Sequence, residues 1–373
     1  MTAPEPVPHA DLFGGRALEL APRVLWGSAG GVGLPFVLAR LEFHPRGLDA
    51  HERALATRAG ARFAPRSGGY EAVALDAAAL GDLAEHGASL ALLAHAARAA
   101  AAALPPPVLV GVLNTTPDSF SDGGRHASVD AAADAATKLA QAGAAWVDVG
   151  GESTRPGATP VAADEEARRV WPVIEALGPR FAAGICIDTM KATVAAGALD
   201  RGASWVNDVS AGCADPGMLP LVADRGAGIC LMHKRGVPAT MQKDPVYTDV
   251  VREVVEHLRG RVGAAHAAGI ALPRIWIDPG IGFGKTLEHN LVLIARLHEF
   301  CSLGLPILLG VSRKGFVGTL TGQREAAARL MGTAAAVALG IQGGATLLRV
   351  HDVAAMGEVL AVARAVRDAK GPQ

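Results

Sequence analysis

Polar side chains recur along residues 108–351, each directly after a short apolar run typical of a buried strand. In parallel α/β folds the carboxyl ends of the strands converge on one face, where ligands bind. One such residue alone is as readily a helix N-cap, but a whole set is hard to explain as packing, because burying unpaired polar groups costs free energy. The set comprises Asn114, Asp148, Asp188, Asn207, Asp208, His233, Asp278, Ser312, Arg313, Lys314, Arg349 and His351.

One group within this set suits a flat nitrogen heterocycle. Asp188, Asn207 and Asp278 offer hydrogen-bond acceptors, and a carboxylate can accept from two adjacent N–H groups. Lys314 can donate to a carbonyl on the same ring edge. We therefore expect these four residues to share one pocket.

A second group is cationic and suits a phosphate-bearing substituent. It consists of Arg155, Arg349 and His351, with Ser153, Thr154 and several glycines near Arg155. Asn114 and Asp122 could hold Mg²⁺ against such an anion, because Mg²⁺ prefers oxygen ligands combined with phosphate. The sequence thus predicts a heterocycle pocket beside an anion pocket.

The elements that must position these residues alternate regularly from Val108 onward. Eight apolar runs predict strands, and the longer segments between them predict helices, which matches an α/β fold of the (β/α)8 TIM-barrel type in count and length. A doubly wound open sheet is the alternative, because periodicity does not show closure. The predicted strands are Val108–Asn114, Trp146–Gly150, Gly184–Asp188, Trp205–Asp208, Gly228–His233, Ile275–Asp278, Ile307–Ser312 and Leu347–His351. The main predicted helices are Asp164–Leu177, Thr248–Ala268, His289–Leu303, Glu325–Gln342 and Ala354–Lys370.

Two details of the predicted helices can be checked. The helix from His289 should place Leu291, Ile294, Leu297 and Phe300 on one face, the spacing that packs a helix onto a sheet. Pro172 lies inside another helical pattern and should kink it.

The N-terminal part differs in texture and ends at Leu104–Pro107, where three prolines cannot continue a helix. We therefore expect two domains, an N-terminal extension over residues 1–105 and a barrel over residues 106–373. The extension reads as a small α/β unit with no indication of its role. Its predicted elements are two short strands around Pro22, a strand Phe36–Phe43, a helix Leu48–Ala59, a strand pair Ala61–Ala64 and Glu71–Leu75, and helices Ala77–Glu85 and Ser89–Ala103.

Composition excludes several classes of function. The 373-residue chain is half apolar and carries a net charge of −1, so no basic field favours nucleic acid. It contains no run of 18 apolar residues, and its first residues lack the pattern of a signal peptide, which predicts a cytoplasmic protein without a membrane span. Cys186 and Cys230 lie in apolar runs and read as buried, reduced thiols.

Two motif near-misses lead to no site. Pro279–Thr286 resembles a Walker A loop, but Pro279 occupies the position of the first glycine and the segment follows the sixth predicted strand. His233, His289 and His351 lack the spacing of a histidine metal site. His233 can equally be a satisfied polar residue at a strand end.

Long, ordered motifs over residues 108–368 closely resemble the dihydropteroate synthase family. The motifs are Asn114–Gly124, Asp148–Gly157, Leu231–His233, Asp278–Lys285, Ser312–Lys314 and Arg349–Asp352. The resemblance implies a pterin-binding TIM barrel, a transferase of folate biosynthesis. It would join p-aminobenzoate to 6-hydroxymethyl-7,8-dihydropterin diphosphate and release diphosphate.

The resemblance also implies roles for individual residues. Asp188, Asn207, Asp278 and Lys314 would hold the pterin, with Met232 lining its pocket, and Asn114 would bind Mg²⁺. Arg155, Arg349 and His351 would bind diphosphate, with Thr154 beside them. Phe120, Pro156 and Lys314 would flank p-aminobenzoate, and Asp118 and Asp122 would belong to the mobile loop that closes over it. The expected catalytic residues are Asp122, Arg155, Lys314, Arg349 and His351.

Some positions depart from the family pattern. Met190 stands where a serine often follows Asp-Thr, and the charged pair Lys234–Arg235 follows Met-His. Gly315 replaces a serine that helps to hold the p-aminobenzoate carboxylate, so affinity for that substrate is affected more than the reaction. The amides at the helix start could still bind the carboxylate.

Two other functions stay open at this point. A methyltransferase domain acting on a reduced folate would share the barrel and the pterin pocket, but has no need for Phe120 or for the pair Arg349 and His351. A pterin-binding protein without turnover is the other. Expected partners are small-molecule substrates, and a homodimer is a further expectation.

Overall fold

The computed structural model describes the barrel almost completely and the N-terminal part only in its strands. The described residues are 20–26, 37–43, 50, 54, 57–58, 62–65, 71–74, 106–115, 124–153, 158–236, 241–242 and 245–368. Two compact units make up the chain. One comprises Met1–Leu104, His298–Leu305 and Lys370–Gln373, and the other comprises Pro105–Leu297 and Pro306–Ala369.

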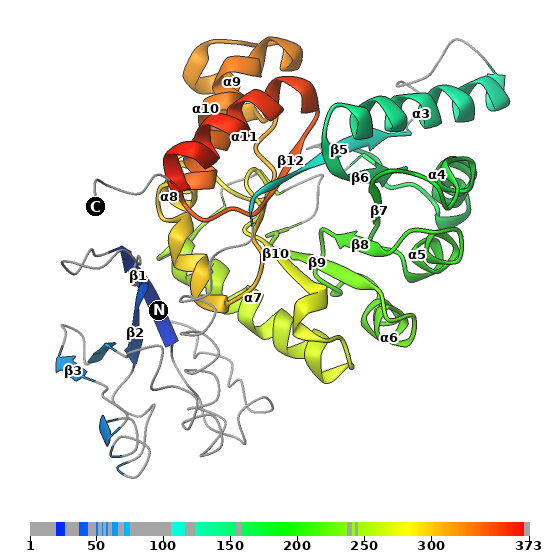
Figure 1. Cartoon of the computed structure of the whole chain (residues 1–373). Coiled ribbons are helices and arrows are strands. Elements are labelled where there is room, and N and C mark those ends of the chain that lie inside the picture. Colours follow the sequence, from blue (N-terminus) through cyan, green and yellow to red (C-terminus); the bar gives the residue numbers. More distant parts are fainter. Residues whose placement is uncertain are drawn as a thin grey trace. The chain divides into compact units, whose positions relative to one another are not determined.

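Eight parallel strands form the larger unit, and they close into a barrel (Figure 1). Their order in the sheet is β10-β9-β8-β7-β6-β5-β12-β11, and a parallel bridge between Ile277 and Ile307 joins the two end strands. The TIM barrel is therefore confirmed over an open sheet. The strands are β5 Val108–Asn114, β6 Ala144–Gly150, β7 Gly184–Asp188, β8 Trp205–Asp208, β9 Gly228–Met232, β10 Ile275–Asp278, β11 Leu308–Leu309 and β12 Leu347–Val350.

Helices follow the strands and cover the outside of the barrel (Figure 1). Their apolar faces repeat at helical spacing: α4 buries Ala167, Val170, Val173 and Ile174. This helix runs without interruption through Pro172. The helices are α3 Gly124–Gln141, α4 Ala163–Leu177, α5 Ala192–Leu199, α6 Met218–Asp224, α7 Val250–Ala267, α8 Leu287–Ala295, α9 Gly315–Thr321, α10 Leu330–Gln342 and α11 Val353–Asp368.

The barrel interior is built in layers, because alternate residues of a strand face the same side. Toward the amino ends of the strands, Trp205 stacks on Trp276 with ring centroids 3.9 Å apart, and Trp146 meets both rings edge-on. Gly184 and Gly228 make room for them: a Cβ at either position would lie 2.3 Å from a tryptophan ring atom. Cys186, Cys230, Val110, Leu308 and Leu347 complete this apolar layer.

Several predicted elements have different limits in the structure. The predicted helix His289–Leu303 is wrong as one element, since α8 ends at Ala295 and a 3₁₀ helix covers Leu297–Leu303. Of the face predicted for this helix, Ile294, Leu297 and Phe300 are buried. Leu291 is 38% exposed, and Leu293 is buried instead. The predicted helix Glu325–Gln342 is likewise a 3₁₀ turn, Ala326–Arg329, followed by α10. The strand predicted at Ile307–Ser312 is only Leu308–Leu309.

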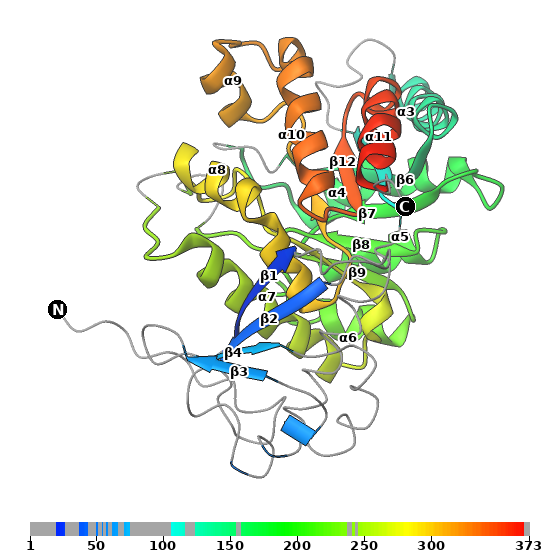
Figure 2. The same cartoon turned by 60° about the vertical axis from the view of Figure 1, so that its left-hand side comes forward.

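Four antiparallel strands are described in the N-terminal part, ordered β1-β2-β4-β3 (Figure 2). They are β1 Leu20–Trp26, β2 Val37–Phe43, β3 Arg62–Pro65 and β4 Glu71–Ala74. The predicted pair at residues 61–75 exists, whereas the two strands expected around Pro22 are one strand. Most of the predicted helix 48–59, and both Ala77–Glu85 and Ser89–Ala103, lie outside the described residues.

Candidate active site

Arg349 lies at the centre of a buried charge network at the carboxyl ends of the strands. From β12, its Nε donates to Asp148 Oδ2 of β6 at 2.6 Å, and its Nη2 donates to Asp188 Oδ2 of β7 at 2.7 Å. The side chain of Asp148 is 1% exposed and that of Asp188 is 9% exposed. The two predicted groups are therefore not separate, because this guanidinium neutralises a carboxylate expected to hold the heterocycle.

Asn207 of β8 is oriented by the same network. Its Nδ2 donates to Asp148 Oδ2 at 3.0 Å, so its amide oxygen points elsewhere. That Oδ1 is buried and accepts no hydrogen bond from the part of the chain that the structure describes. Since buried acceptors are normally satisfied, an N–H donor of a ligand is the natural partner.

Asp278 and Lys314 come from β10 and from the turn before α9. Asp278 is 5% exposed, and its Oδ1 accepts from the backbone N–H of Gly280 at 2.7 Å, leaving the other oxygen for a ligand. Lys314 Nζ donates to the carbonyl of Ile281 and lies 4.4 Å from the centre of the Phe283 ring. The charges of Asp278 and Asp188 both act on Lys314, which places all three in one neighbourhood.

The loop after β10 shapes one wall of this pocket, and it depends on glycine. Gly280 has φ of 68°, and a Cβ there would lie 1.9 Å from the carbonyl oxygen of His233. Lys285, at the end of the loop, is 2% exposed and donates from Nζ to the carbonyls of Gly280 at 2.9 Å and Phe283 at 3.0 Å. The side-chain nitrogen of Lys285 therefore ties the loop together.

Burial dominates the titration of this site. It raises the pKa of Asp188 to about 7, although Arg349 opposes the shift, and it raises the pKa of Asp278 against the field of Lys314. Burial also lowers the pKa of Lys314 to about 8. Shifted pKa values of several groups buried together are typical of functional sites.

Comparison with known proteins agrees with this geometry. The family model described as "Pterin binding enzyme" matches residues 110–351. The dihydropteroate synthase of Escherichia coli (strain K12) is 44% identical over 266 residues, covering 71% of this chain and 93% of its own length. That of Synechocystis sp. is 44% identical over 258 residues, covering 69% of this chain and 89% of its own length. The chain belongs to the dihydropteroate synthase family.

Solved structures of dihydropteroate synthases agree with the barrel. The Xanthomonas albilineans enzyme with 4-aminobenzoic acid is 47% identical, covers 72% of this chain and 95% of its own, and superposes with a TM-score of 0.67. The same enzyme in complex with 7,8-dihydropteroate gives 44% identity, 72% and 96% coverage, and a TM-score of 0.65. The part of the chain that these relatives cover is about the length of the barrel unit.

The family's remaining expected residues fall into two sets. Met232, at the end of β9, is 2% exposed, and Asn114, at the end of β5, is half-buried. His351 Nδ1 lies 3.0 Å from Ser312 Oγ, which also accepts from the His351 backbone N–H at 3.2 Å. The other set lies outside the described residues: Asp118, Phe120 and Asp122 within 116–123, and Thr154, Arg155 and Pro156 within 154–157.

Two residues of the site had no predicted role. Asp148 binds both Asn207 and Arg349, and Ser312 binds His351. Both stood in the set of polar strand ends, so the signal was present, but the sequence did not show which side chains they meet. His233, by contrast, is a satisfied residue: it is 4% exposed, its Nδ1 lies 2.9 Å from Lys285 Nζ, and burial lowers its pKa to about 2.

Gly315 and the family departures can also be located. A Cβ at Gly315 would meet no atom within 4 Å, so this position has space for the serine that the family often carries. Met190 and Lys234 contact one another, with Lys234 Nζ 3.0 Å from Met190 Sδ. Two departures that are 44 residues apart in the sequence therefore occur as one pair.

Proposed function

We propose that this chain carries out the reaction of its family, joining p-aminobenzoate to 6-hydroxymethyl-7,8-dihydropterin diphosphate to give 7,8-dihydropteroate and diphosphate. The observation that carries the proposal is the buried Oδ1 of Asn207, which has no partner among the described residues and lies at the strand end next to Asp188. With Asp278 at the end of β10, three acceptors at the carboxyl ends of barrel strands suit the amino group and ring N–H groups of a pterin.

In this proposal, different residues bind the pterin ring, the diphosphate and p-aminobenzoate. Asp188, Asn207 and Asp278 accept from the pterin ring, Lys314 donates to its carbonyl, and Met232 packs against it. Arg349 and His351, with Arg155 and Thr154, hold the diphosphate. Arg349 carries out both tasks, since it also stabilises Asp188, from which it is 2.7 Å distant. Phe120, Pro156 and Asp122 complete the p-aminobenzoate side.

The reaction needs a departing anion and a nucleophile. The bond from the pterin methylene carbon to the diphosphate oxygen breaks, and its electron pair leaves with diphosphate. The lone pair of the arylamine nitrogen forms the new carbon–nitrogen bond, and the amine proton goes to solvent. A neutral arylamine is already nucleophilic, so we assign no general base. The cations around the diphosphate stabilise its growing negative charge.

Mg²⁺ fits the residues present. In the described part of the chain no group of three His, Cys, Asp or Glu residues could enclose a metal ion. Asn114, half-buried at the end of β5, supplies a single amide oxygen, and Mg²⁺ commonly takes one or two protein ligands plus substrate phosphates and water. We propose Asn114 and Asp122 as those ligands. When bound there, Mg²⁺ would neutralise charge on the diphosphate.

We also place the protein in the cytoplasm, supported by the buried free thiols of Cys186 and Cys230. In the described residues no helix has both the length and the apolar character needed to cross a membrane. Exposed apolar side chains on the neighbouring helices α10 and α11, among them Met331 at 80% and Val362 at 67%, support a homodimer. The molecular mass in solution tests that assembly.

The decisive experiment is diphosphate release measured with each component omitted in turn. We expect release only when the pterin diphosphate, p-aminobenzoate and Mg²⁺ are all present. Release without p-aminobenzoate would indicate a hydrolase and contradict the proposal. Pterin binding by calorimetry without any release would support the binding protein, and methyl transfer from a reduced folate would support the methyltransferase.

A further inference from the structure

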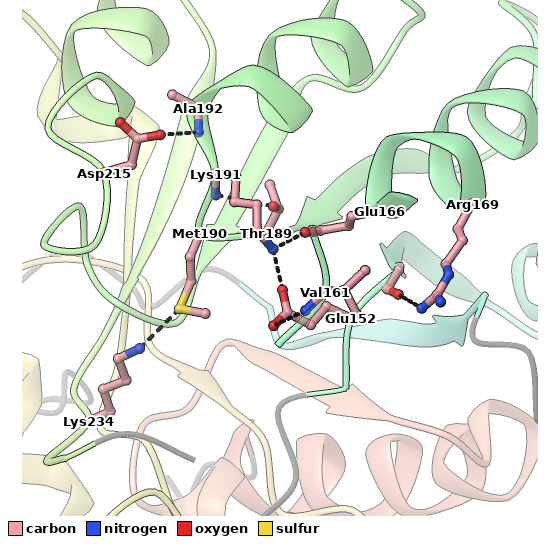
Figure 3. Close-up of polar contacts among 11 residues, drawn as sticks. Glu152, Val161, Glu166, Arg169, Thr189, Met190, Lys191, Ala192, Asp215 and Lys234 are labelled. Carbon is pink, nitrogen blue, oxygen red and sulfur yellow. Dashed lines mark hydrogen bonds and ion pairs between the residues drawn. The ribbon is translucent and has the colours of Figure 1, made fainter. Parts of the chain in front are cut away.

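Lys191 links two loops at the mouth of the barrel (Figure 3). It follows β7 by three residues, and its Nζ donates to Glu152 Oε2 and to Glu166 Oε2. Glu152 lies two residues after the end of β6, and Glu166 lies in the first turn of α4. One ammonium group therefore joins the end of one strand, the start of the next helix and the loop after the neighbouring strand.

Glu152 closes the loop between β6 and α4. Its second oxygen, Oε1, accepts from the backbone N–H of Val161 at 3.3 Å, so the residue before the segment 153–160 is bonded to the residue after it. Arg169 adds another contact to the base of the loop, because its Nη1 donates to the carbonyl of Gly151 at 2.9 Å. In the sequence, Thr154, Arg155 and Pro156 lie between these fixed ends.

The charges in this cluster make Lys191 its organising member. The side chain of Glu166 is 0% exposed, that of Glu152 is 12% exposed and that of Lys191 is 25% exposed. Burial alone would lower the pKa of Lys191, but its bonds to the two carboxylates outweigh burial and raise the pKa, so the ammonium stays charged. Lys191 is the shared cation of both carboxylates, and its removal would leave the buried charge of Glu166 uncompensated.

The segment that carries Lys191 is itself held on several sides (Figure 3). The backbone N–H of Lys191 donates to Thr189 Oγ1 at 3.2 Å, and the N–H of Ala192 donates to Asp215 Oδ2 at 2.8 Å. On the other side, Lys234 Nζ contacts Met190 Sδ. Lys191 thus extends from a fixed support toward the loop after β6, rather than from one free loop to another.

We propose that Lys191 is a positioning residue for the diphosphate of the substrate, because through Glu152 and Glu166 it fixes the two ends of the loop after β6, the loop that carries Arg155 in the sequence. This inference rests on the proposed function. Among the described residues, the side chain of Lys191 donates to the two glutamates and to none of the pterin acceptors Asp188, Asn207 and Asp278. Its loss should therefore affect handling of the diphosphate and spare recognition of the ring.

The first measurement compares two ligands by calorimetry in the presence of Mg²⁺ and without p-aminobenzoate: the pterin diphosphate and the corresponding alcohol. We expect Lys191→Met to lower the affinity for the diphosphate about tenfold and to leave the affinity for the alcohol unchanged, because a displaced cation loses most of its contact. Lys191→Arg keeps the positive charge and should therefore keep the wild-type preference for the diphosphate over the alcohol. Lys138→Met, an exposed lysine on α3, is the matched control and should behave as the wild type.

A double-mutant cycle with Arg155→Ala tests whether the effect passes through Arg155. Lys191→Met should cause little further loss in the Arg155→Ala background, since residues that act on one contact are not additive. The inference would be overturned if the two substitutions caused additive losses of affinity for the diphosphate. It would also be overturned if Lys191→Met lowered the affinity for both ligands equally, or left the preference for the diphosphate over the alcohol unchanged. If Lys191→Met fails to fold, Glu152→Gln makes the same test, because its side chain keeps an acceptor for Val161 and loses the charge. Wild-type protein without diphosphate release would refute the proposed function instead.

Discussion

The two ends of the barrel interior use the same strands in opposite ways. We call the apolar layer toward the amino ends of the strands the lower layer, and the polar side chains toward their carboxyl ends the upper layer. In β6, β7, β8, β10 and β12, an apolar residue of the lower layer is followed two positions later by a charged or amide residue of the upper layer. The pairs are Trp146 and Asp148, Cys186 and Asp188, Trp205 and Asn207, Trp276 and Asp278, and Leu347 and Arg349. Residues two apart in a strand face the same side, so each strand contributes once to packing and once to chemistry.

The difference between the layers lies in what satisfies each side chain. Lower-layer side chains are held mainly by apolar contact, as in the stacked rings of Trp205 and Trp276, and their one buried polar atom without a partner among the described residues is Trp205 Nε1. Upper-layer side chains are buried as deeply but only partly satisfied, as the free Oδ1 of Asn207 shows among the described residues. Such groups cost stability without their ligand, and the apolar layer beneath offsets that cost. The lower layer should therefore govern stability and the upper layer affinity.

The largest expected effect is at the lower layer. Trp205→Ala should lower the free energy of unfolding by about 3 kcal/mol, because it opens a cavity beneath the site, although it also removes a buried indole N–H that has no partner among the described residues. Urea unfolding measures the loss. Affinity for the pterin alcohol, measured by calorimetry at low temperature, should stay as in the wild type. An affinity that falls in step with stability would mean that the two layers are not independent.

A smaller effect is expected from Asp278→Asn, which should lower affinity for the pterin and leave stability unchanged. The asparagine oxygen can still accept from Gly280, so the loop should keep its shape, but the charge that attracts the pterin N–H donors is lost. We expect pterin affinity to fall about 100-fold, by about 2 to 3 kcal/mol. Unfolding in urea should show no loss of stability. Asp200→Asn, which changes an exposed carboxylate paired with Arg225, is the matched control. Unchanged calorimetric affinity would remove Asp278 from the site.

The smallest expected effect, when it is counted per pH unit, is a pH dependence of stability that belongs to the upper layer. Because burial raises the pKa of Asp188 to about 7, the folded protein binds a proton that the unfolded chain, with a pKa near about 4, has already lost. Stability should therefore fall as pH rises from about 4 to about 7, by at most about 1.4 kcal/mol per pH unit, and this contribution should level off above that range. Asp188→Asn lacks this contribution, so the stability of the variant relative to the wild type should rise as pH rises from about 4 to about 7.

Urea unfolding of both proteins at several pH values measures that difference. If the stability of Asp188→Asn and of the wild type changed with pH in parallel, Asp188 would be ionised throughout, and the charge of Arg349 would outweigh the effect of burial on its pKa.

Much of the site could be predicted because a strand fixes where its side chains point. Once Asp188, Asn207 and Asp278 were recognised at strand ends, the fold alone brought them to one mouth. Element limits were less predictable where helix type changes, as at Ala295, because packing rather than residue pattern decides between an α-helix and a 3₁₀ helix.

The sequence alone determined the alternation of strand and helix, the polar strand ends and the motifs of the family, because these depend on residue type and spacing along the chain. Tertiary structure decided which of these groups meet. It paired Arg349 with Asp148 and Asp188, gave Lys191 its two glutamates and joined the Asn207 amide to Asp148. These contacts join residues up to 201 positions apart. Closure of the barrel brings these residues together, and burial in its interior then shifts the pKa values of their side chains.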